Sequence, residues 1–344
     1  MHQHIQPLFD GPVDIVADIH GEIAALDALL ERLGYTSDGR HREGRRLVFV
    51  GDLVDRGADS PAVVERVAGM VVAGRAQCVL GNHELNLLRE ARKEGNGWFW
   101  PEESDHDVAI GKFEESARAS DSQRRDFRRW FDTLPVALER PDLRVVHACW
   151  RDDTMKRLRS SNTPASVAYA DFTDEVSDVL HRSGKYEQRT QELAEWGGLL
   201  ADPTATVPLL PSLAAIDSLR QSGHPLRAAT SGLERPAAVP FYASGKWRMN
   251  ERVAWWNEYD DEPAVVFGHY WRWPLSVEEA SARSHGPNLF AGMEPFQWLG
   301  PRNNAMCIDW CVGLRWKERL AGVQRHEGKL GALRWPEREV VLDS

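Results

Sequence analysis

The chain begins with a regular alternation of short apolar runs and amphipathic stretches, and this rhythm constrains the fold more than any other feature of the sequence. Val13–Ala17 and Leu47–Val50 are predicted strands, and Cys78–Leu80 ends a third. Apolar residues at helical spacing predict a helix over Ile23–Leu33, and Ser60-Pro61 is a typical helix start. A β-α-β-α-β order implies right-handed crossovers and a sheet that is at least partly parallel.

The rest of the 344-residue chain continues this pattern with one long interruption. Residues from about 90 to 142 are predicted to be mainly helical. Residues at about 151–257 are polar and mixed, and we expect them to form an inserted, cap-like segment over the core of a single domain spanning 1–344. Three further strands are predicted at Leu143–Val146, Ala264–Phe267 and Met306–Ile308. Gly331–Asp343 is predicted to form an antiparallel pair of strands around a proline.

Charge and composition exclude several classes of protein. The formal net charge is -10, which argues against a long nucleic acid as partner. No run approaches the ~18 apolar residues of a membrane span, and the N-terminus lacks an apolar signal core. The four cysteines form no C-x-x-C pair, so we expect reduced thiols and a cytoplasmic protein. Several of the 14 tryptophans occur in pairs, for which core packing is favoured over the wall of a pocket.

Polar side chains follow five of the predicted strands directly, and these are the residues that carry chemistry. In an open α/β sheet, ligands bind outside the carboxyl ends of the strands. Imidazole and carboxylate suit divalent transition metals, and one carboxylate can bridge two ions. Two ions about 3.5–4 Å apart stabilise both the entering and the leaving oxygen in phosphoryl transfer. Any one of these short motifs could instead be a helix cap or a polar loop, but their occurrence together and in this order favours a metal site. The residues are Asp18, His20, Asp52, Asp55, Arg56, Asn82, His83, His147 and His269.

Three sequence blocks resemble the signatures of a known family. Asp-Ile-His-Gly at 18–21, Gly-Asp-Leu-Val-Asp-Arg-Gly at 51–57 and Gly-Asn-His-Glu at 81–84 are similar to those of the phosphoprotein-phosphatase branch of calcineurin-like metallophosphoesterases. That branch also includes symmetrical diadenosine tetraphosphate hydrolases and the phosphatase module of bacterial polynucleotide kinase-phosphatases. The resemblance continues around His147 and His269 and fades between Arg151 and Asn257. It implies an α/β (α+β) fold, a four-layer αββα sandwich of two mixed β-sheets flanked by helices.

The resemblance also implies a role for each residue of the set. Two divalent ions are expected, with Mn²⁺ as the first choice and Fe, Zn or Co as alternatives. Their implied ligands are Asp18, His20 and a bridging Asp52 for the first ion, and Asn82, His147 and His269 with Asp52 for the second. His83 resembles the general acid, Asp55 the carboxylate that orients it, and Arg56 a clamp for phosphate.

A second phosphate-binding arginine is expected between the two late histidines. Arg248 and Arg252 are the candidates, and their i, i+4 spacing would place both on one helix face. A solvated face is the alternative, and the sequence does not choose between the two arginines. The block around Asp309 departs from the family pattern, with Trp310 in place of a threonine. Asp309 is expected either to support His269 or the metal shell, or to be a turn residue.

The predicted function is hydrolysis of phosphate monoesters, in phosphoproteins or small phosphoesters, by metal-activated hydroxide with His83 as general acid. The alternative is hydrolysis of dinucleoside polyphosphates or of nucleic-acid end phosphates, including 2′,3′-cyclic phosphates. An inactive regulatory module is a further alternative, but such a protein should lack ligands that this chain retains. Cys149 is expected to be packed rather than ligating, and His106 to lie in a solvated loop.

Overall fold

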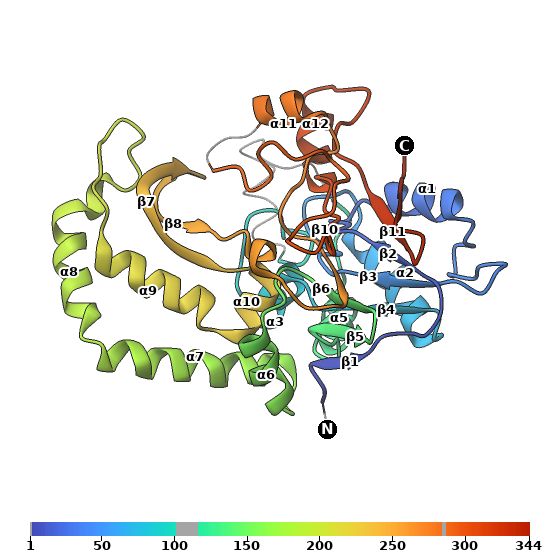
Figure 1. Cartoon of the computed structure of the whole chain (residues 1–344), viewed down its shortest axis with the longest axis horizontal. Coiled ribbons are helices and arrows are strands. Elements are labelled where there is room, and N and C mark those ends of the chain that lie inside the picture. The colour runs from blue at the N-terminus through green and yellow to red at the C-terminus, as the bar shows by residue number, and fades with distance from the viewer. Residues whose placement is uncertain (1, 101–115, 284–286) are drawn as a thin grey trace.

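The computed structural model describes residues 2–100, 116–283 and 287–344 (Figure 1). One five-stranded sheet has the order β12-β11-β2-β3-β4. Its parallel part is built from the predicted crossovers, which run through helices α1 (Ile23–Leu33) and α2 (Ser60–Val72). The antiparallel pair at the end of the chain completes it, as predicted. The strands are β2 (Val13–Val16), β3 (Arg46–Phe49), β4 (Ala76–Cys78), β11 (Gly331–Trp335) and β12 (Glu339–Leu342).

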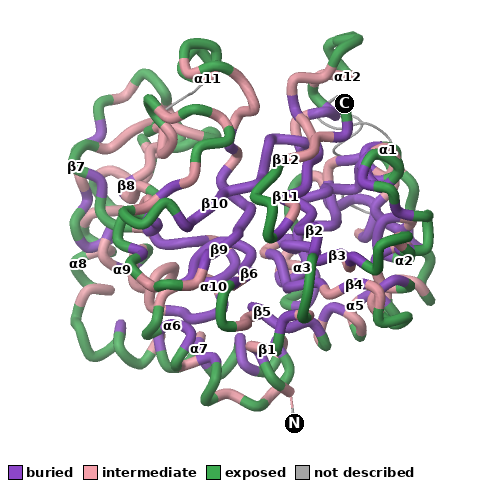
Figure 2. The backbone as a smooth tube through the Cα atoms, turned by 45° about the vertical axis from the view of Figure 1, so that its right-hand side comes forward, coloured by how far each residue is buried: buried purple, intermediate pink, exposed green. Residues whose placement is uncertain are grey.

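A second five-stranded sheet has the order β1-β5-β6-β9-β10 and is also mixed. Only β5 and β6 pair in antiparallel fashion, and the other neighbours are parallel. Figure 2 shows the inner strands of both sheets as mostly buried, and the edge strands β1 and β12 are only partly buried. Apolar side chains from both sheets belong to one core. The expected arrangement of two mixed sheets with flanking helices is therefore confirmed. The strands are β1 (Ile5–Pro7), β5 (Ala137–Arg140), β6 (Leu143–Val146), β9 (Ala264–Phe267) and β10 (Ala305–Cys307).

The helices between the first strands form where the sequence provides both an apolar face and a stop. Helix α1 buries Leu26, Leu29 and Leu30, and it ends at Gly34, whose φ of 85° suits a residue without a side chain. Helix α2 starts at a cap in which the Asp59 carboxylate accepts the Ala62 N–H, with proline in the first turn. The starts of α1 and α2 leave short loops after β2 and β3, and the polar residues of the first two motifs lie in these loops.

The segment at 151–257 holds five α-helices and a β-hairpin. Figure 1 shows α7, α8, α9 and the hairpin as a crescent that projects from the two-sheet core, and its middle part has small apolar clusters of its own. Helices α6 and α10 instead contribute side chains to the main core. The elements are α6 (Asp152–Ser160), α7 (Ala165–Arg182), α8 (Lys185–Trp196), α9 (Pro211–Ser222), α10 (Pro225–Ser231), β7 (Glu234–Ala243) and β8 (Lys246–Arg252).

The prediction that Arg248 and Arg252 share a helix face is wrong, because both lie on strand β8. Residues four apart share a face in a strand as well as in a helix, so the spacing could not separate the two structures. The local signal was the turn: Ser244 and Gly245 both have positive φ, at 50° and 77°, as a tight hairpin connection requires.

The other helices are shorter or lie at the edges of the molecule. They are α3 (Asn82–Leu88), α5 (Asp121–Phe131), α11 (Val277–Arg283) and α12 (Arg315–Leu320). Helix α5 falls in the region predicted to be mainly helical, part of which (101–115) lies outside the described residues. Among the helices described, none combines the length and apolarity needed to cross a membrane.

Candidate active site

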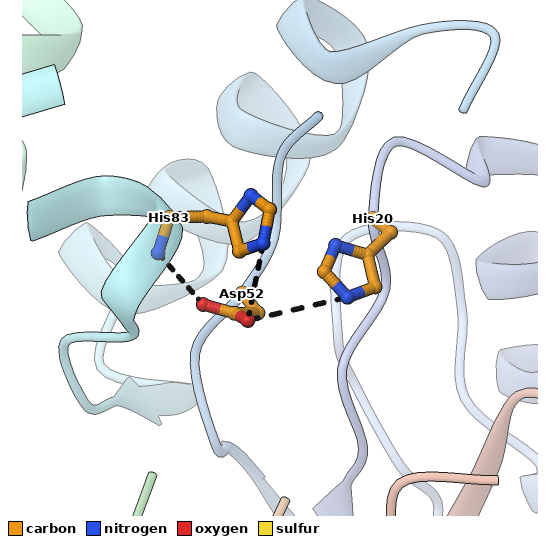
Figure 3. A group of neighbouring side chains, drawn as sticks. All are labelled: His20, Asp52 and His83. Atoms are coloured by element: carbon orange, nitrogen blue, oxygen red, sulfur yellow. Dashed lines mark hydrogen bonds and ion pairs between the residues drawn. The ribbon is translucent and has the colours of Figure 1, made fainter. Parts of the chain in front are cut away.

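Strand ends from both sheets converge on the carboxylate of Asp52. Two groups of potential metal donors share this residue: His20, Asp52 and His83 in one group, and Asp52, His147 and His269 in the other. Asp52 Oδ2 lies 4.0 Å from His20 Nε2, 3.8 Å from His83 Nε2 and 3.3 Å from His147 Nε2. Figure 3 shows His20 and His83 on either side of the carboxylate, on segments that follow different strands.

Main-chain carbonyls fix the orientation of two of the imidazoles. His20 Nδ1 lies 3.1 Å from the carbonyl oxygen of Val54, and His147 Nδ1 lies 2.7 Å from that of Val50. A carbonyl accepts only, so each Nδ1 carries a proton, and Nε2 is the nitrogen left on the side of Asp52. This is the arrangement by which metal-ligating histidines are held in the correct tautomer. The donor set therefore fits divalent cations.

Asn82 and Asp18 meet the second donor group in different ways. The Asn82 side-chain amide lies 2.8 Å from His269 Nδ1 and 3.2 Å from His147 Nε2, so it faces the same point as the two imidazoles. Asp18 belongs to neither donor group, and its carboxylate accepts the His269 N–H at 3.1 Å. Only glycine fits at Gly268, where a Cβ would lie 1.9 Å from Asp18 Oδ1. Thus the Asn82 amide lies among the donors of the second group, whereas Asp18 contacts the backbone of His269.

The backbone of the site is strained. His20, Asp52, Asp55, Arg56 and His269 have φ values of 50°, 48°, 73°, 73° and 70°, in the left-handed region that L-residues rarely adopt. Such conformations cost about 1–3 kcal/mol each and persist where surrounding contacts enforce them, most often at functional sites. The strain therefore marks the same residues that the motifs single out.

Burial and close charges set the protonation of the groups around Asp52. Burial raises the pKa of Asp52, but His147, His83 and His20 outweigh it and hold that pKa well below the usual value. Burial lowers the pKa of His147, yet Asp52 reverses the effect and raises it to about 10. For His20, burial and the Arg56 charge hold the pKa well below its ordinary value, so this imidazole is neutral. An ionised Asp52 beside a neutral His20 is the state that a metal requires.

Excess negative charge is buried beside this pair. Burial, followed by the charges of Asp309 and Asp52, raises the pKa of Asp18 well above its usual value. Burial also raises the pKa of Asp309. Buried carboxylates that repel one another are stabilised by cations, so these three groups also fit a metal centre.

A second cluster surrounds His83 on the outer side of the site. His83 Nδ1 lies 2.6 Å from Asp55 Oδ2, as expected for an orienting carboxylate. Arg56 Nη1 lies 2.9 Å from His20 Nε2 and Arg56 Nη2 lies 3.2 Å from His83 Nε2, with the aromatic ring of Trp271 5.0 Å from the guanidinium carbon. These contacts cover the nitrogens of the first donor group, so a cation on His20 requires Arg56 to release them.

Sequence reasoning missed Glu84, which shapes the loop of the bridging carboxylate. The side chain of Glu84 is fully buried and accepts the N–H groups of Asp52 at 3.0 Å, Leu53 at 2.8 Å and Gly81 at 3.0 Å. Burial and the Asp52 charge raise the pKa of Glu84 to about 7. The only sequence signal was its place in the Gly-Asn-His-Glu block, where a first-turn helix carboxylate is also ordinary.

The remaining predicted residues lie around the periphery. Asp309 accepts the N–H of Trp271 at 2.9 Å and that of Cys311 at 3.0 Å, so it holds the backbone after His269 rather than the imidazole. Cys149 is a buried free thiol outside both donor groups. The guanidinium carbon of Arg252 lies 5.9 Å from the ring centre of Tyr270, next to His269. His106 lies outside the described residues.

Comparisons with known proteins agree with this geometry. A family model described as calcineurin-like phosphoesterase matches residues 11–294. The asymmetrical bis(5′-nucleosyl)-tetraphosphatase PrpE of Bacillus subtilis is 34% identical over 171 residues, which cover 47% of this chain and 67% of that protein. PrpE of Geobacillus thermodenitrificans is 32% identical over 173 residues, covering 48% of this chain and 68% of that protein.

Solved structures include a cold-active protein-tyrosine phosphatase of the psychrophile Shewanella sp. It is 13% identical, covers 98% of this chain and 83% of that chain, and has a TM-score of 0.42. The family match extends over most of the chain and includes every strand end that contributes a donor to the site. The chain therefore belongs to the calcineurin-like phosphoesterase family and is a hydrolase.

Proposed function

We propose that this hydrolase cleaves phosphate monoesters at a site for two divalent cations, with His83 as the acid that protonates the leaving oxygen. The observation that carries the proposal is the position of Asp52 Oδ2, which is common to two groups of donor atoms. A single-metal site has no use for such a shared carboxylate, because one ion is satisfied by one set of ligands.

The implied ligand sets follow the donor groups. His20 and Asp52 would hold one ion together with Asp18, and Asp52, Asn82, His147 and His269 would hold the other. When bound, two such ions lower the pKa of water and neutralise charge on the phosphoryl group. Nitrogen and oxygen donors of this kind suit manganese, iron, zinc or cobalt, and Mn²⁺ is our first choice.

The chain's own residues supply binding and proton transfer. Arg56 presents a planar guanidinium at the mouth of the first donor group, where it can bind two phosphoryl oxygens. Asp55 fixes the proton of His83 on Nδ1, so Nε2 faces the site and can carry the proton for the leaving group. An acid at this position favours an alkoxide leaving group, because an alkoxide is too basic to depart unprotonated.

A second candidate substrate is a dinucleoside polyphosphate. The specific observation in its favour is the similarity to two PrpE proteins named as bis(5′-nucleosyl)-tetraphosphatases. This similarity covers about half of the chain, so residues in the other half can give this protein a different substrate specificity. The leaving group of such a substrate is a phosphate, which departs as a weak base and needs an acid less than an alkoxide does.

The first test replaces His83 with asparagine in the metal-loaded enzyme. We expect the kcat for an alkyl phosphate or a phosphopeptide to fall by about 10²–10⁴-fold, the range of a lost general acid. The kcat for para-nitrophenyl phosphate, whose leaving group needs no proton, should fall much less.

Metal content measured on the same variant separates the acid role from a ligand role. We expect two ions per chain to remain in His83→Asn and to be lost in Asp52→Asn. Unchanged turnover of the alkyl ester in His83→Asn would disprove the acid role. Diadenosine tetraphosphate is included in the panel, and a kcat/KM for it far above that of every monoester would establish the second candidate instead.

A further inference from the structure

A short segment that joins α3 to the next part of the chain lies across the residues that serve the acid. Residues 93–100 contact both Asp55 and Arg56, the two consecutive residues with a φ of 73°. The carbonyl oxygen of Gly95 accepts the Arg56 N–H at 3.2 Å. Trp98 Nε1 donates to Asp55 Oδ1 at 2.5 Å. The strained pair is therefore held from outside the motif that contains it.

Both oxygens of the Asp55 carboxylate contact a hydrogen-bond donor. Oδ2 faces His83 Nδ1 at 2.6 Å, and Oδ1 accepts the indole N–H of Trp98. The Asp55 backbone N–H donates to Ser60 Oγ at 2.9 Å. Asp55 and Trp98 are each 1% exposed, so water does not compete for these bonds. A carboxylate held by two donors on opposite oxygens cannot rotate, and the imidazole bound to it keeps one orientation.

Packing fixes Trp98 in turn. Its ring meets Phe99 edge-on, with ring centres 5.2 Å apart, and lies 6.3 Å from the ring of Phe127 on helix α5. The carbonyl oxygen of Trp98 accepts the Ala119 N–H at 2.9 Å. These contacts restrict the Trp98 side chain, and its N–H is directed at Asp55 without a bound substrate.

We propose that Trp98 is a positioning residue for the reaction: its indole N–H locks the Asp55 carboxylate that orients His83. The inference rests on the proposed function, because it gives Trp98 a role only if His83 is the acid. It assigns a function to a tryptophan that packing alone does not explain, since an apolar side chain would fill the same core without a donor.

The test compares Trp98→Phe with Trp100→Phe in the metal-loaded enzyme. Trp100 is a matched control because its ring also meets Phe99 edge-on, at 5.0 Å, while its Nε1 has no hydrogen-bond partner in the described part of the chain. We expect Trp98→Phe to lower the kcat for phenyl phosphate by about tenfold and that for para-nitrophenyl phosphate by about twofold or less. Trp100→Phe should leave the ratio of the two substrates unchanged.

A double-mutant cycle tests whether Trp98 acts through Asp55. In the Asp55→Asn background, Trp98→Phe should cause no further change in the substrate ratio. Equal losses on both substrates, or a full additional loss in the Asp55→Asn background, would assign Trp98 a packing role only. If His83→Asn itself leaves the substrate ratio unchanged, the proposed function fails; if only Trp98→Phe leaves it unchanged, the inference alone fails.

A spectroscopic measurement covers the case in which Trp98→Phe does not fold. The indole N–H of a tryptophan bonded to a carboxylate gives a proton resonance shifted downfield. In Asp55→Asn, one such resonance among the tryptophan indoles should move upfield while the others stay in place. A spectrum in which no indole resonance responds to Asp55→Asn would overturn the proposal.

Discussion

The two arginines of β8 have different electrostatic surroundings although they share one strand. Arg252 is exposed, and after burial its charge is the next cause that lowers the pKa of His269. Arg248 is half-buried and donates to the carbonyl oxygen of Ala243 at 3.1 Å, with Glu234 among the charges that act on it. Among the described residues no side-chain hydrogen bond engages the Arg252 guanidinium, which lies beside Tyr270 and the candidate ligand His269, whereas Arg248 is bonded within the hairpin.

This difference predicts which arginine binds substrate phosphate. We expect Arg252→Gln to lower kcat/KM by roughly 10–100-fold, the cost of one lost charge-assisted bond to phosphate. Arg248→Gln is the matched control on the same strand and should change kcat/KM by about twofold or less. Steady-state kinetics with a saturable monoester measures both, and a larger effect for Arg248→Gln would reverse the assignment.

Single residues were predictable from the sequence where their chemistry required a particular type. A shared carboxylate and imidazole donors were expected at Asp52, His20 and His147, and the structure brings their donor atoms together. Glu84 and Trp98 were not predictable as supporting residues, since a buried carboxylate that accepts three N–H groups and a tryptophan that donates to Asp55 are defined by partners distant in sequence. The contact of Asp18 with the backbone of His269 was not predicted either, and the role of Asp18 as a metal ligand stays a prediction.

Helix α10 links the segment at 151–257 to the candidate metal site. Its Ala229 carbonyl oxygen accepts the N–H groups of Ala148 at 2.9 Å and Cys149 at 3.2 Å, directly after the candidate ligand His147. The helix begins at His224, whose Nδ1 accepts the Arg227 N–H at 3.3 Å as a cap. His224 Nε2 lies 3.2 Å from the carbonyl oxygen of Tyr169, so the ring is neutral with its proton on Nε2.

Acid should therefore weaken the fold through this cap. Burial lowers the pKa of His224 to about 4, against 6.5 for an exposed histidine. As the pH falls below 6.5, His224 binds a proton in the unfolded chain but stays neutral in the folded chain. The stability contributed by His224 is therefore complete above pH 6.5 and is lost progressively toward pH 4. The loss amounts to about 2 kcal/mol between pH 7.5 and 5.

Thermal unfolding of the wild type and His224→Asn across this pH range measures the effect. Asparagine caps a helix without titrating in this range, so the variant should lose less stability on acidification than the wild type. The comparison removes the contribution of other groups, such as His4, whose pKa burial also lowers to about 4. Parallel pH profiles for the two proteins would contradict the role of His224.

At the scale of elements, the sequence predicted what local patterns determine. The strands and helices of the first sheet follow from apolar periodicity, Gly34 and Pro61, and they match the structure to within a few residues. Strand β8 was missed because its period was ambiguous, although the turn at Ser244 and Gly245 that leads from β7 into β8 was a local signal. Tertiary contacts, rather than propensity, decide such a segment.

At the scale of the whole molecule, the candidate site lies between two sheets that share no strand pairing among the described residues. Asp52 follows β3 of one sheet, and His147 and His269 follow β6 and β9 of the other. Each sheet is complete without the other, so the strand ends that meet here are joined by side chains and by the apolar core. Cations bound between them would add a link that exists only in the folded chain.

Metal removal should therefore lower the stability of the whole protein. A ligand that binds only the folded state adds about 3 kcal/mol when present at ~100 times its Kd, so Mn²⁺ should raise Tm and a chelator should reverse the rise. Buried Asp18, Asp52 and Asp309 repel one another without cations, which adds to the loss in the stripped protein. Differential scanning calorimetry of the wild type and Asp52→Asn provides the check. The variant relieves part of the repulsion and removes the shared ligand, so its Tm should not respond to Mn²⁺. An equal response in both proteins would place the bound ions elsewhere in the molecule.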